Sequence, residues 1–201
     1  EVLVKHVTSG KAISVSAVKE NWRSEKNFIS SQLVGVDFDQ SPGVDALIEQ
    51  DAFIRDHAFL VYPTASHTDA APRSRVLFAL DAPITDKDEY KKLVKRLLHR
   101  FDQQPDEQCK DAARVFYGSN KPGYRADVNK CLPVAVLRDL PPHPDELKPP
   151  PAERQATAIA DLETKMRAEK YSLAVKQNIL TEALAVPAGA GHRHEAFNDA
   201  A

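Results

Sequence analysis

Apolar and polar residues follow two different periods in the first two thirds of the chain, and these periods predict both strands and helices. In residues 33–39 the apolar side chains of Val34, Val36 and Phe38 occupy alternate positions, the pattern of a strand whose two faces differ. Short apolar runs predict four further strands, at 59–62, 75–80, 114–118 and 132–137.

Two other segments place apolar residues at helical spacing. Residues 43–57 do so on one side, and residues 85–102 form the stronger pattern, with an apolar stripe from Tyr90 to Phe101 opposite lysines and arginines. Thr85 is expected to cap this second helix. Because strands and helices are interleaved and the later strands resemble hairpins, the pattern predicts an α+β domain around a central sheet.

A proline-rich segment divides the chain. Six of the eleven residues in 141–151 are proline, which fixes φ and lacks an amide donor, so this segment is expected to be a stiff linker. It separates a body at 1–140 from a tail at 152–201, whose apolar residues predict two or three helices. The 201 residues therefore have room for one ordinary domain with a helical appendage.

Composition narrows the classes of protein that fit. With 42% hydrophobic and 28% charged residues the chain has a soluble globular profile, and no apolar run approaches the ~18 residues that span a membrane. Cys109 and Cys131 are too few for a four-thiolate zinc site and are expected to be structural, as in an intracellular protein. A net charge of −2 provides no broad positive field, so any contact with nucleic acid must be local or helped by metal ions.

Asp37 and Asp39 are the first candidates for chemistry. In a strand, residues i and i+2 lie on the same face, roughly 6–7 Å apart at Cα, and two carboxylates there repel each other unless a divalent cation lies between them. Oxygen ligands favour Mg²⁺ or Mn²⁺, and Gly35 on the same face would leave space for a substrate. The alternative is that the strand ends at Phe38 and both aspartates are solvated.

His67 is the second candidate, in the segment TASHT directly after the predicted strand 59–62. An imidazole between small hydroxyl residues can donate to a phosphate or bind a metal, and Arg75 would come near it if the two strands pair. A surface-loop histidine is the alternative.

The third candidate is the polar segment 101–119. Taken alone, this segment predicts a loop, but it could supply a further carboxylate from Asp102, Asp106 or Asp111.

Other residues could contact nucleic acid. Trp22, Arg23 and Lys26 precede the first aspartates, and an aromatic ring there could stack on a base, although a single tryptophan is more often part of a core. The basic face of helix 85–102 could contact phosphates, although an ordinary solvated face is the simpler interpretation.

The order and spacing of these segments resemble the catalytic core of the archaeo-eukaryotic primase superfamily, and most of all the primase–polymerase (PrimPol) domains of phage and plasmid replication proteins. The chain has VDFD at 36–39, SHT at 66–68 followed by PRSRVLFALDAPITDKDEY, and PDEQCKDAARVFYG at 105–118. That family has a strand ending in D-x-D, a strand followed by S-x-H, and a later hydrophobic residue followed by Asp. The resemblance covers residues ~30–125 and implies a palm-like α+β catalytic core with a mixed or antiparallel central sheet.

By this resemblance, three acidic residues would hold two divalent cations. Asp37 and Asp39 match the first motif. The third motif is matched less completely, because Pro105 stands where the family has a large apolar residue. In order of preference the third ligand is Asp106, Asp111 or Asp102.

The resemblance also implies a nucleotide site. His67 matches the histidine of the second motif and would contact the triphosphate. The usual serine position holds Ala65, and Ser66 lies immediately before the histidine, which changes the expected hydroxyl contact. The residues expected to contact the nucleotide are His67, Ser66, Arg75, Arg114 and Lys121.

The implied activity is DNA-templated nucleotidyl transfer by a primase, a DNA polymerase or both. Two Mg²⁺ or Mn²⁺ ions would help to join an NTP or dNTP to a 3′-hydroxyl on a single-stranded DNA template, in the cytoplasm of a bacterial or phage-infected cell. GHRHEAF at 191–197 is similar to the start of a helical module that follows PrimPol domains, which implies a C-terminal helicase region. The alternatives are a metal-dependent nuclease and a non-catalytic nucleic-acid-binding module.

Overall fold

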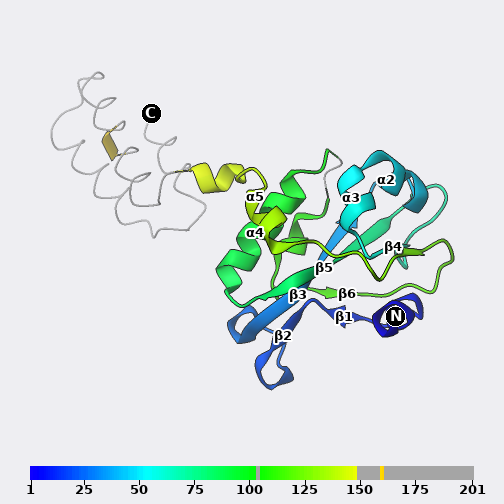
Figure 1. Cartoon of the computed structure of the whole chain (residues 1–201), viewed down its shortest axis with the longest axis horizontal. Coiled ribbons are helices and arrows are strands. Elements are labelled where there is room, and N and C mark those ends of the chain that lie inside the picture. The colour runs from blue at the N-terminus through cyan, green and yellow to red at the C-terminus, as the bar shows by residue number, and fades with distance from the viewer. Residues whose placement is uncertain (103–104, 149–158, 161–201) are drawn as a thin grey trace, which may run out of the picture. The chain divides into compact units, whose positions relative to one another are not determined.

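The computed structural model describes residues 1–102, 105–148 and 159–160, and the chain divides into two compact units, Glu1–Leu147 and Lys148–Ala201. The first unit contains nearly all of the described residues and mixes strands with helices (Figure 1). The expected α+β class is therefore confirmed. Within the described residues, no helix is both long and apolar enough to cross a membrane.

Five strands form an antiparallel sheet at the centre of the first unit: β2 Ser16–Val18, β3 Phe28–Phe38, β4 Leu60–Pro63, β5 Ser74–Ile84 and β7 Arg125–Ala126. Their order in the sheet is β2-β3-β5-β4-β7. The long strands β3 and β5 pair over most of their length. They include the predicted strand 75–80 and all of the predicted strand 33–39 except Asp39. The shorter strand β4 corresponds to the predicted strand 59–62 and lies on the other side of β5.

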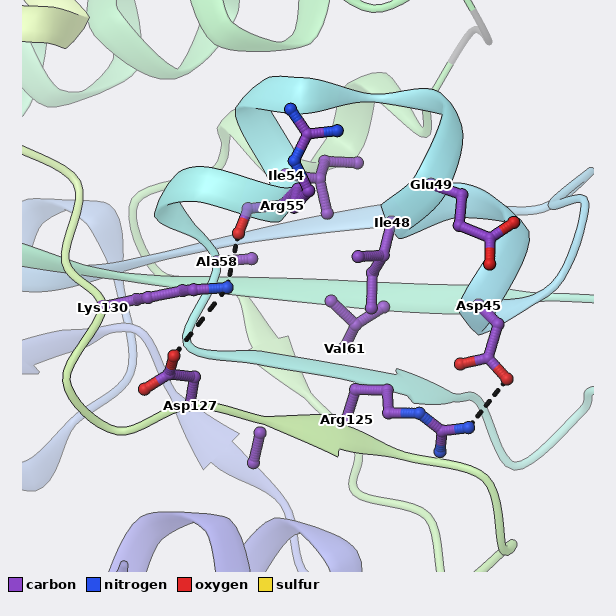
Figure 2. A pocket seen from close by; sticks show the side chains of 11 residues that line it. Asp45, Ile48, Glu49, Ile54, Arg55, Ala58, Val61, Arg125, Asp127 and Lys130 are labelled. Atoms are coloured by element: carbon purple, nitrogen blue, oxygen red, sulfur yellow. Dashed lines mark hydrogen bonds and ion pairs between the residues drawn. The ribbon is translucent and has the colours of Figure 1, made fainter.

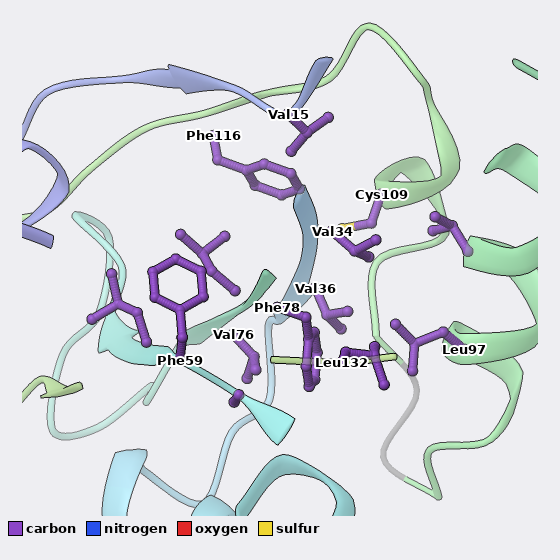
Figure 3. Packing of buried hydrophobic residues seen from close by; sticks show 14 of the residues in the cluster. Val15, Val34, Val36, Phe59, Val76, Phe78, Leu97, Cys109, Phe116 and Leu132 are labelled. Carbon is purple, nitrogen blue, oxygen red and sulfur yellow. The ribbon is translucent and has the colours of Figure 1, made fainter. Parts of the chain in front are cut away.

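Four of the described helices cover one face of this sheet: α2 Val44–Gln50, α3 Ala52–His57, α4 Lys87–His99 and α5 Val134–Asp139. Helix α1 Val2–Thr8 instead lies beside residues 118–119, where the carbonyl of Val7 accepts from the amide of Ser119 at 2.9 Å. The 3₁₀ turns are η1 Lys19–Asn21, η2 Glu25–Asn27, η3 Glu107–Lys110 and η4 Pro144–Leu147. Phe53 of α3 packs on Phe78 of β5 with ring centroids 5.8 Å apart. Phe101, just after α4, packs edge-on against Phe38 of β3 at 5.2 Å. These contacts place α3 and α4 on the sheet face that carries the even-numbered side chains of β3. Figure 3 shows part of the buried core, including Val34 and Val36 of this face and Phe116 of the opposite face.

A two-stranded ribbon covers the opposite face. It pairs β1 Ile13–Ser14 with β6 Val115–Phe116, the observed part of the predicted strand 114–118. Phe116 is fully buried above Gly35, where an added Cβ would lie 2.6 Å from Cζ of Phe116. The expectation that Gly35 leaves space for a substrate is therefore wrong, because the ring of Phe116 occupies that space.

The segment 132–137, expected as a strand, instead begins helix α5. Leu132 makes a single bridge with Leu80 of β5, and the chain then turns away from the sheet. Pro133 precedes the first helical residue with φ −60°, a value that proline favours and that suits a helix start, where a missing amide donor costs nothing. Periodicity does not separate a short buried helix from a strand.

Two helix boundaries also differ from expectation. The segment 43–57 forms two helices because Asp51 has an extended backbone, with φ −114° and ψ 107°, and its side chain accepts hydrogen bonds from the first amides of α3. The strong helix begins after Asp86 rather than Thr85, since the carboxylate of Asp86 accepts from the amide of Glu89 at 2.7 Å. In both places a neighbouring aspartate provides the cap.

The beginning of the proline-rich segment belongs to the first compact unit. Glu146 of η4 accepts hydrogen bonds from Nε and Nη2 of Arg96 at 2.7 and 2.6 Å, and Lys92 lies 3.2 Å from the same carboxylate. These contacts fasten η4 to the basic face of α4, so part of that face is engaged within the protein. The remainder of the predicted linker, the tail at 152–201 and GHRHEAF lie almost entirely outside the described residues, and the division at 140 and 151 stays a prediction.

Replacing Glu146 with glutamine should lower the melting temperature at neutral pH, and the loss should shrink on acidification. Hydrogen bonds from Arg96 lower the pKa of Glu146 from 4.5 to about 2 against the opposing effect of burial. The stability that this shift provides is present above pH ~4.5 and is lost as the pH falls through about 2. Thermal unfolding of both proteins from pH 7 to pH 3 should show a Tm difference that narrows below pH ~5, and a constant difference would contradict this.

Candidate functional site

The open edge of β3 brings two distant aspartates together. β2 pairs with β3 only as far as Ser31, so the last residues of β3 have no strand on that side. The segment leading into η3 fills the gap: the amide of Asp106 donates to the carbonyl of Asp37 at 2.9 Å, and the amide of Asp37 lies 3.4 Å from Sγ of Cys109. This backbone pairing places Asp106 beside Asp37.

The hydrogen bonds between the backbone of Asp37 and the η3 segment also determine how Arg75 contacts Asp37. Since both backbone polar groups of Asp37 face η3, its pairing with Arg75 of β5 is of the non-hydrogen-bonded kind, in which cross-strand side chains approach most closely. Nε of Arg75 donates to Oδ1 of Asp37, and Nη2 donates to Oδ2 at 3.0 Å. Each side chain is only 10% exposed. This is a bidentate, largely buried ion pair.

Other groups complete the surroundings of Arg75. Its Nη1 donates to the carbonyl of Tyr117 and lies 3.3 Å from the hydroxyl of Tyr62 on β4. Burial alone would lower the pKa of Arg75, but the hydrogen bonds and negative charge of Asp37 outweigh it and raise the pKa. Arg75 is therefore a permanent cation that joins β3, β4, β5 and the end of β6.

Asp106 has an arginine of its own. Its Oδ2 accepts from Nη2 of Arg114 at 2.8 Å, and the same nitrogen lies 3.7 Å from Oδ2 of Asp37. Its Oδ1 accepts from the amide of Gln108 at 2.8 Å and so caps η3. Asp106 is one-quarter exposed at the side chain, which makes this end of the cluster open to solvent.

The donor set suits a hard divalent cation. One ligand atom from each of Asp37, Asp106 and Cys109 lies within 4.8 Å of the other two. Burial, followed by the charge of Asp37, raises the pKa of Cys109 to about 12, so the thiol is neutral and the anionic donors are carboxylate oxygens. Each carboxylate has about four lone-pair sites, and the arginines leave some of them free. These residues fit Mg²⁺ or Mn²⁺.

Asp39 does not share this cluster. It lies beyond Phe38, the last residue of β3, and its side chain is 63% exposed. Nη1 of Arg73 donates to its Oδ1 at 3.1 Å. The expectation of two carboxylates side by side on one strand face is therefore not met at Asp39, because the strand ends before it.

The other two candidates for the third carboxylate have different environments. Asp111 accepts from the amide of Ala113 at 2.8 Å in a local turn. Asp102 lines a separate pocket with Lys95 and His99 of α4. Within the described residues, Asp106 is the member of this set that lies in the cluster of Asp37.

His67 lies in the loop between β4 and β5 with a defined orientation. Its Nδ1 lies 3.0 Å from the amide nitrogen of Arg73 and 3.2 Å from the carbonyl oxygen of the same residue. Because the closer partner, the amide, can only donate, Nδ1 is assigned as the acceptor and the ring proton to Nε2. Nζ of Lys121 donates to the carbonyl of His67 and so ties the loop after β6 to this loop. Ser66 is exposed, and its hydroxyl lies 3.3 Å from that of Thr64.

Sequence reasoning missed three contributors to the site: Tyr62, Cys109 and the carbonyl of Tyr117. Burial raises the pKa of Tyr62 despite the opposing charge of Arg75, so the hydroxyl stays neutral beside the guanidinium. The sequence signal for Tyr62 was its position in an apolar strand, which indicates only burial. Its partnership with Arg75 depends on strand register, which pairs Tyr62 with Arg75 and Arg75 with Asp37.

A pocket of about 290 Å³ lies apart from this site, between α2–α3 and β4–β7 (Figure 2). Its apolar wall includes Ile48, Ile54 and Val61, and charged residues at its rim pair with one another, as Arg125 does with Asp45 at 2.7 Å. None of the predicted site residues lines this pocket.

Asp37→Asn and Asp39→Asn should differ strongly in stability although they alter the same D-x-D motif. The first leaves the buried guanidinium of Arg75 without its counter-charge, which costs about 3–5 kcal/mol. The second removes an exposed ion pair, worth about 0–1 kcal/mol. Urea unfolding measures both free energies, and equal losses would contradict the different roles of the two aspartates.

Thiol labelling of the native chain at pH 8 should modify Cys131 and spare Cys109. Cys131 is exposed, whereas Cys109 is buried with its pKa raised to about 12. Counting the labelled thiols by mass spectrometry, with the urea-unfolded chain as the control, measures this. Rapid native labelling of Cys109 would show a thiolate and would contradict an all-oxygen anionic donor set.

Comparison with known proteins places the chain in a family. Residues 12–131, which include every residue predicted for the site, match the VapE N-terminal domain, whereas no curated protein matches the chain. Among solved structures, the chain is similar to the AEP domain (PP-N190) of the cyanophage S-2L primase-polymerase (PrimPol), with 14% identity, a TM-score of 0.49, and 70% of this chain and 76% of that chain covered. Because the family match spans more than half of the sequence, the chain belongs to the VapE N-terminal domain family.

Proposed function

We propose that this domain is a DNA-templated nucleotidyltransferase, a primase, a DNA polymerase or both, that joins an NTP or dNTP to a 3′-hydroxyl. The observation that carries the proposal is the pairing of Asp106 with Asp37. Two aspartates far apart in the sequence meet at the open edge of a strand, beside two arginines, in the order of motifs that resembles PrimPol domains. The family match over residues 12–131 supports the same class.

Asp37 and Asp106 would hold divalent cations, with Asp39 at the exposed end of the site. When bound, two such cations supply charge stabilisation at the attacking and leaving oxygens of phosphoryl transfer. The chain's own part is to hold the carboxylates in a fixed orientation. Arg75 does this for Asp37 through two hydrogen bonds, and Arg114 does it for Asp106.

The nucleotide contacts are proposed for the exposed side of the cluster. His67 has its Nε2–H available, since Nδ1 accepts from Arg73, and can donate to a phosphate oxygen. Arg114 and Lys121 are half-buried and can add positive charge there. Ser66 is exposed in the same loop as His67.

The contacts of Arg75 favour a positioning role over a direct contact with the nucleotide. Its guanidinium already donates to Asp37, to the carbonyl of Tyr117 and toward Tyr62, and little of it is exposed. A single-stranded DNA template, a helicase region in the same polypeptide and a cytoplasmic setting in a bacterial or phage-infected cell belong to this proposal.

A second candidate is a non-catalytic nucleic-acid-binding module. One observation favours it: each proposed metal ligand is already paired with an arginine, Asp37 with Arg75, Asp106 with Arg114 and Asp39 with Arg73. Such a site is electrically balanced without a metal ion. The two candidates therefore differ in whether the carboxylate charge is needed for chemistry.

Asp106→Asn should abolish primer synthesis or extension, and Asp111→Asn should leave it close to the wild type. Asparagine keeps the cap acceptor of η3 at 106 and the turn acceptor at 111. At 106 it removes the negative charge together with the oxygen that accepts from Arg114. Removal of a metal-binding charge is expected to lower the rate at least ~100-fold.

The measurement is incubation with a single-stranded template, labelled nucleotides and Mn²⁺, followed by sizing of the products. Circular dichroism and melting temperature serve as the folding controls. Wild-type activity that survives unchanged in Asp106→Asn would contradict the proposal. No synthesis by the wild type, together with retained binding of the template, would favour the binding module.

A further inference from the structure

Trp22 lies on the surface of the protein and not in its core. It is the single tryptophan of the chain, and 71% of its surface is accessible. The interpretation that it belongs to a core is therefore wrong. A single exposed hydrophobic residue is common on protein surfaces, so the case for a ligand depends on the backbone and the charges around Trp22.

Hydrogen bonds fix the backbone of the turn that carries this ring. Trp22 lies in residues 19–27, which connect β2 to β3 and are called the Trp22 turn here. Glu20 and Asn21 have φ values of 53° and 54°, a left-handed conformation that is uncommon for residues other than glycine. The amide of Trp22 donates to the carbonyl of Lys19 at 3.0 Å, and its carbonyl accepts from Nδ2 of Asn27 at 3.1 Å. A ring presented on a fixed turn loses little conformational entropy on binding.

The charge of the Trp22 turn is positive although that of the chain is negative. Lys19, Arg23 and Lys26 surround the ring in the sequence. Of the two acids in the turn, Glu25 is neutralised by Lys91 of α4, whose Nζ lies 2.8 Å from its carboxylate. An exposed aromatic ring among cations is the combination that binds single-stranded nucleic acid, with bases on the ring and phosphates on the cations.

A direct hydrogen bond connects the Trp22 turn to the candidate site. Nε of Arg23 donates to the carbonyl of Ala113 at 2.6 Å. The next residue, Arg114, binds Asp106. The Trp22 turn therefore lies against the segment that carries Arg114 of the candidate site.

We infer that the Trp22 turn is a binding surface for single-stranded nucleic acid, in which Trp22 stacks on a base and Lys19 and Lys26 meet the phosphates. The identification of that strand as the template rests on the proposed function, whereas the binding itself requires neither nucleotide nor metal. Such a surface is expected to tolerate many sequences, because every base has a π face.

Fluorescence tests the stacking directly, since the emission of the full chain comes from Trp22 alone when tyrosine is not excited. Oligothymidylate added without nucleotide or metal should quench it. An abasic oligonucleotide of equal length, which keeps the phosphates and lacks the bases, should quench it much less. Equal quenching by both, or none by either, would overturn the inference.

Matched variants measure the contribution to affinity, using fluorescence anisotropy of a labelled oligothymidylate. Trp22→Ala should weaken binding about 5- to 150-fold, and Trp22→Phe should recover most of the loss. Leu147→Ala truncates a side chain that is 72% exposed on η4 and should bind like the wild type. Unchanged binding by Trp22→Ala, with unchanged circular dichroism, would overturn the inference, as would Trp22 emission that responds to protein concentration and not to DNA, a sign of self-association.

These results separate the two proposals. If oligothymidylate quenches the Trp22 fluorescence of a chain that synthesises no product, the proposed activity is contradicted and the Trp22 turn remains a binding surface. Template-dependent synthesis by a chain whose Trp22 does not respond to DNA would do the reverse.

Discussion

The site depends on how Asp37 ends its strand. On one side its backbone pairs with the segment that leads into η3, and on the other its carboxylate is held by both nitrogens of a buried guanidinium from β5. The two contacts are linked. Because the backbone of Asp37 pairs with the η3 segment, its cross-strand pair with Arg75 is of the non-hydrogen-bonded kind, and this pairing brings the two side chains close enough to form the ion pair. A buried carboxylate without such a partner would be strongly unfavourable.

The rest of the domain supports this one pair. Phe116 packs over Gly35 and fixes the ribbon on the sheet, and the next residue offers its carbonyl to Arg75. Arg114, on the same segment, binds Asp106 at the opposite end of the cluster. The ribbon and the candidate site therefore share contacts, and a substitution that loosens the ribbon is expected to disturb both carboxylates.

The spacing of apolar residues is enough to predict the strands and the helix that bury one face. Residues 33–39, 59–62 and 75–80 were recognised as strands and 85–102 as a helix, because burial on one face leaves a regular mark in the sequence. The prediction of a strand at 132–137 is wrong, because a short apolar segment suits a strand and a short helix equally. Pro133 favours a helix start only when the chain around it is known to leave the sheet.

The candidate site could be predicted in composition but not in geometry. The order of the motifs predicts Asp37, Asp106 and His67. No periodicity shows that β3 has an unpaired edge, that Asp39 lies beyond the end of β3, or that Tyr62 lies opposite Arg75 in the sheet.

The most direct test of the account is a measurement of Mn²⁺ binding by electron paramagnetic resonance. The account predicts a bound signal in the wild type that is lost in Asp106→Asn and retained in Asp111→Asn; binding that is absent from the wild type, or identical in all three, would contradict a cation site shared by Asp37 and Asp106.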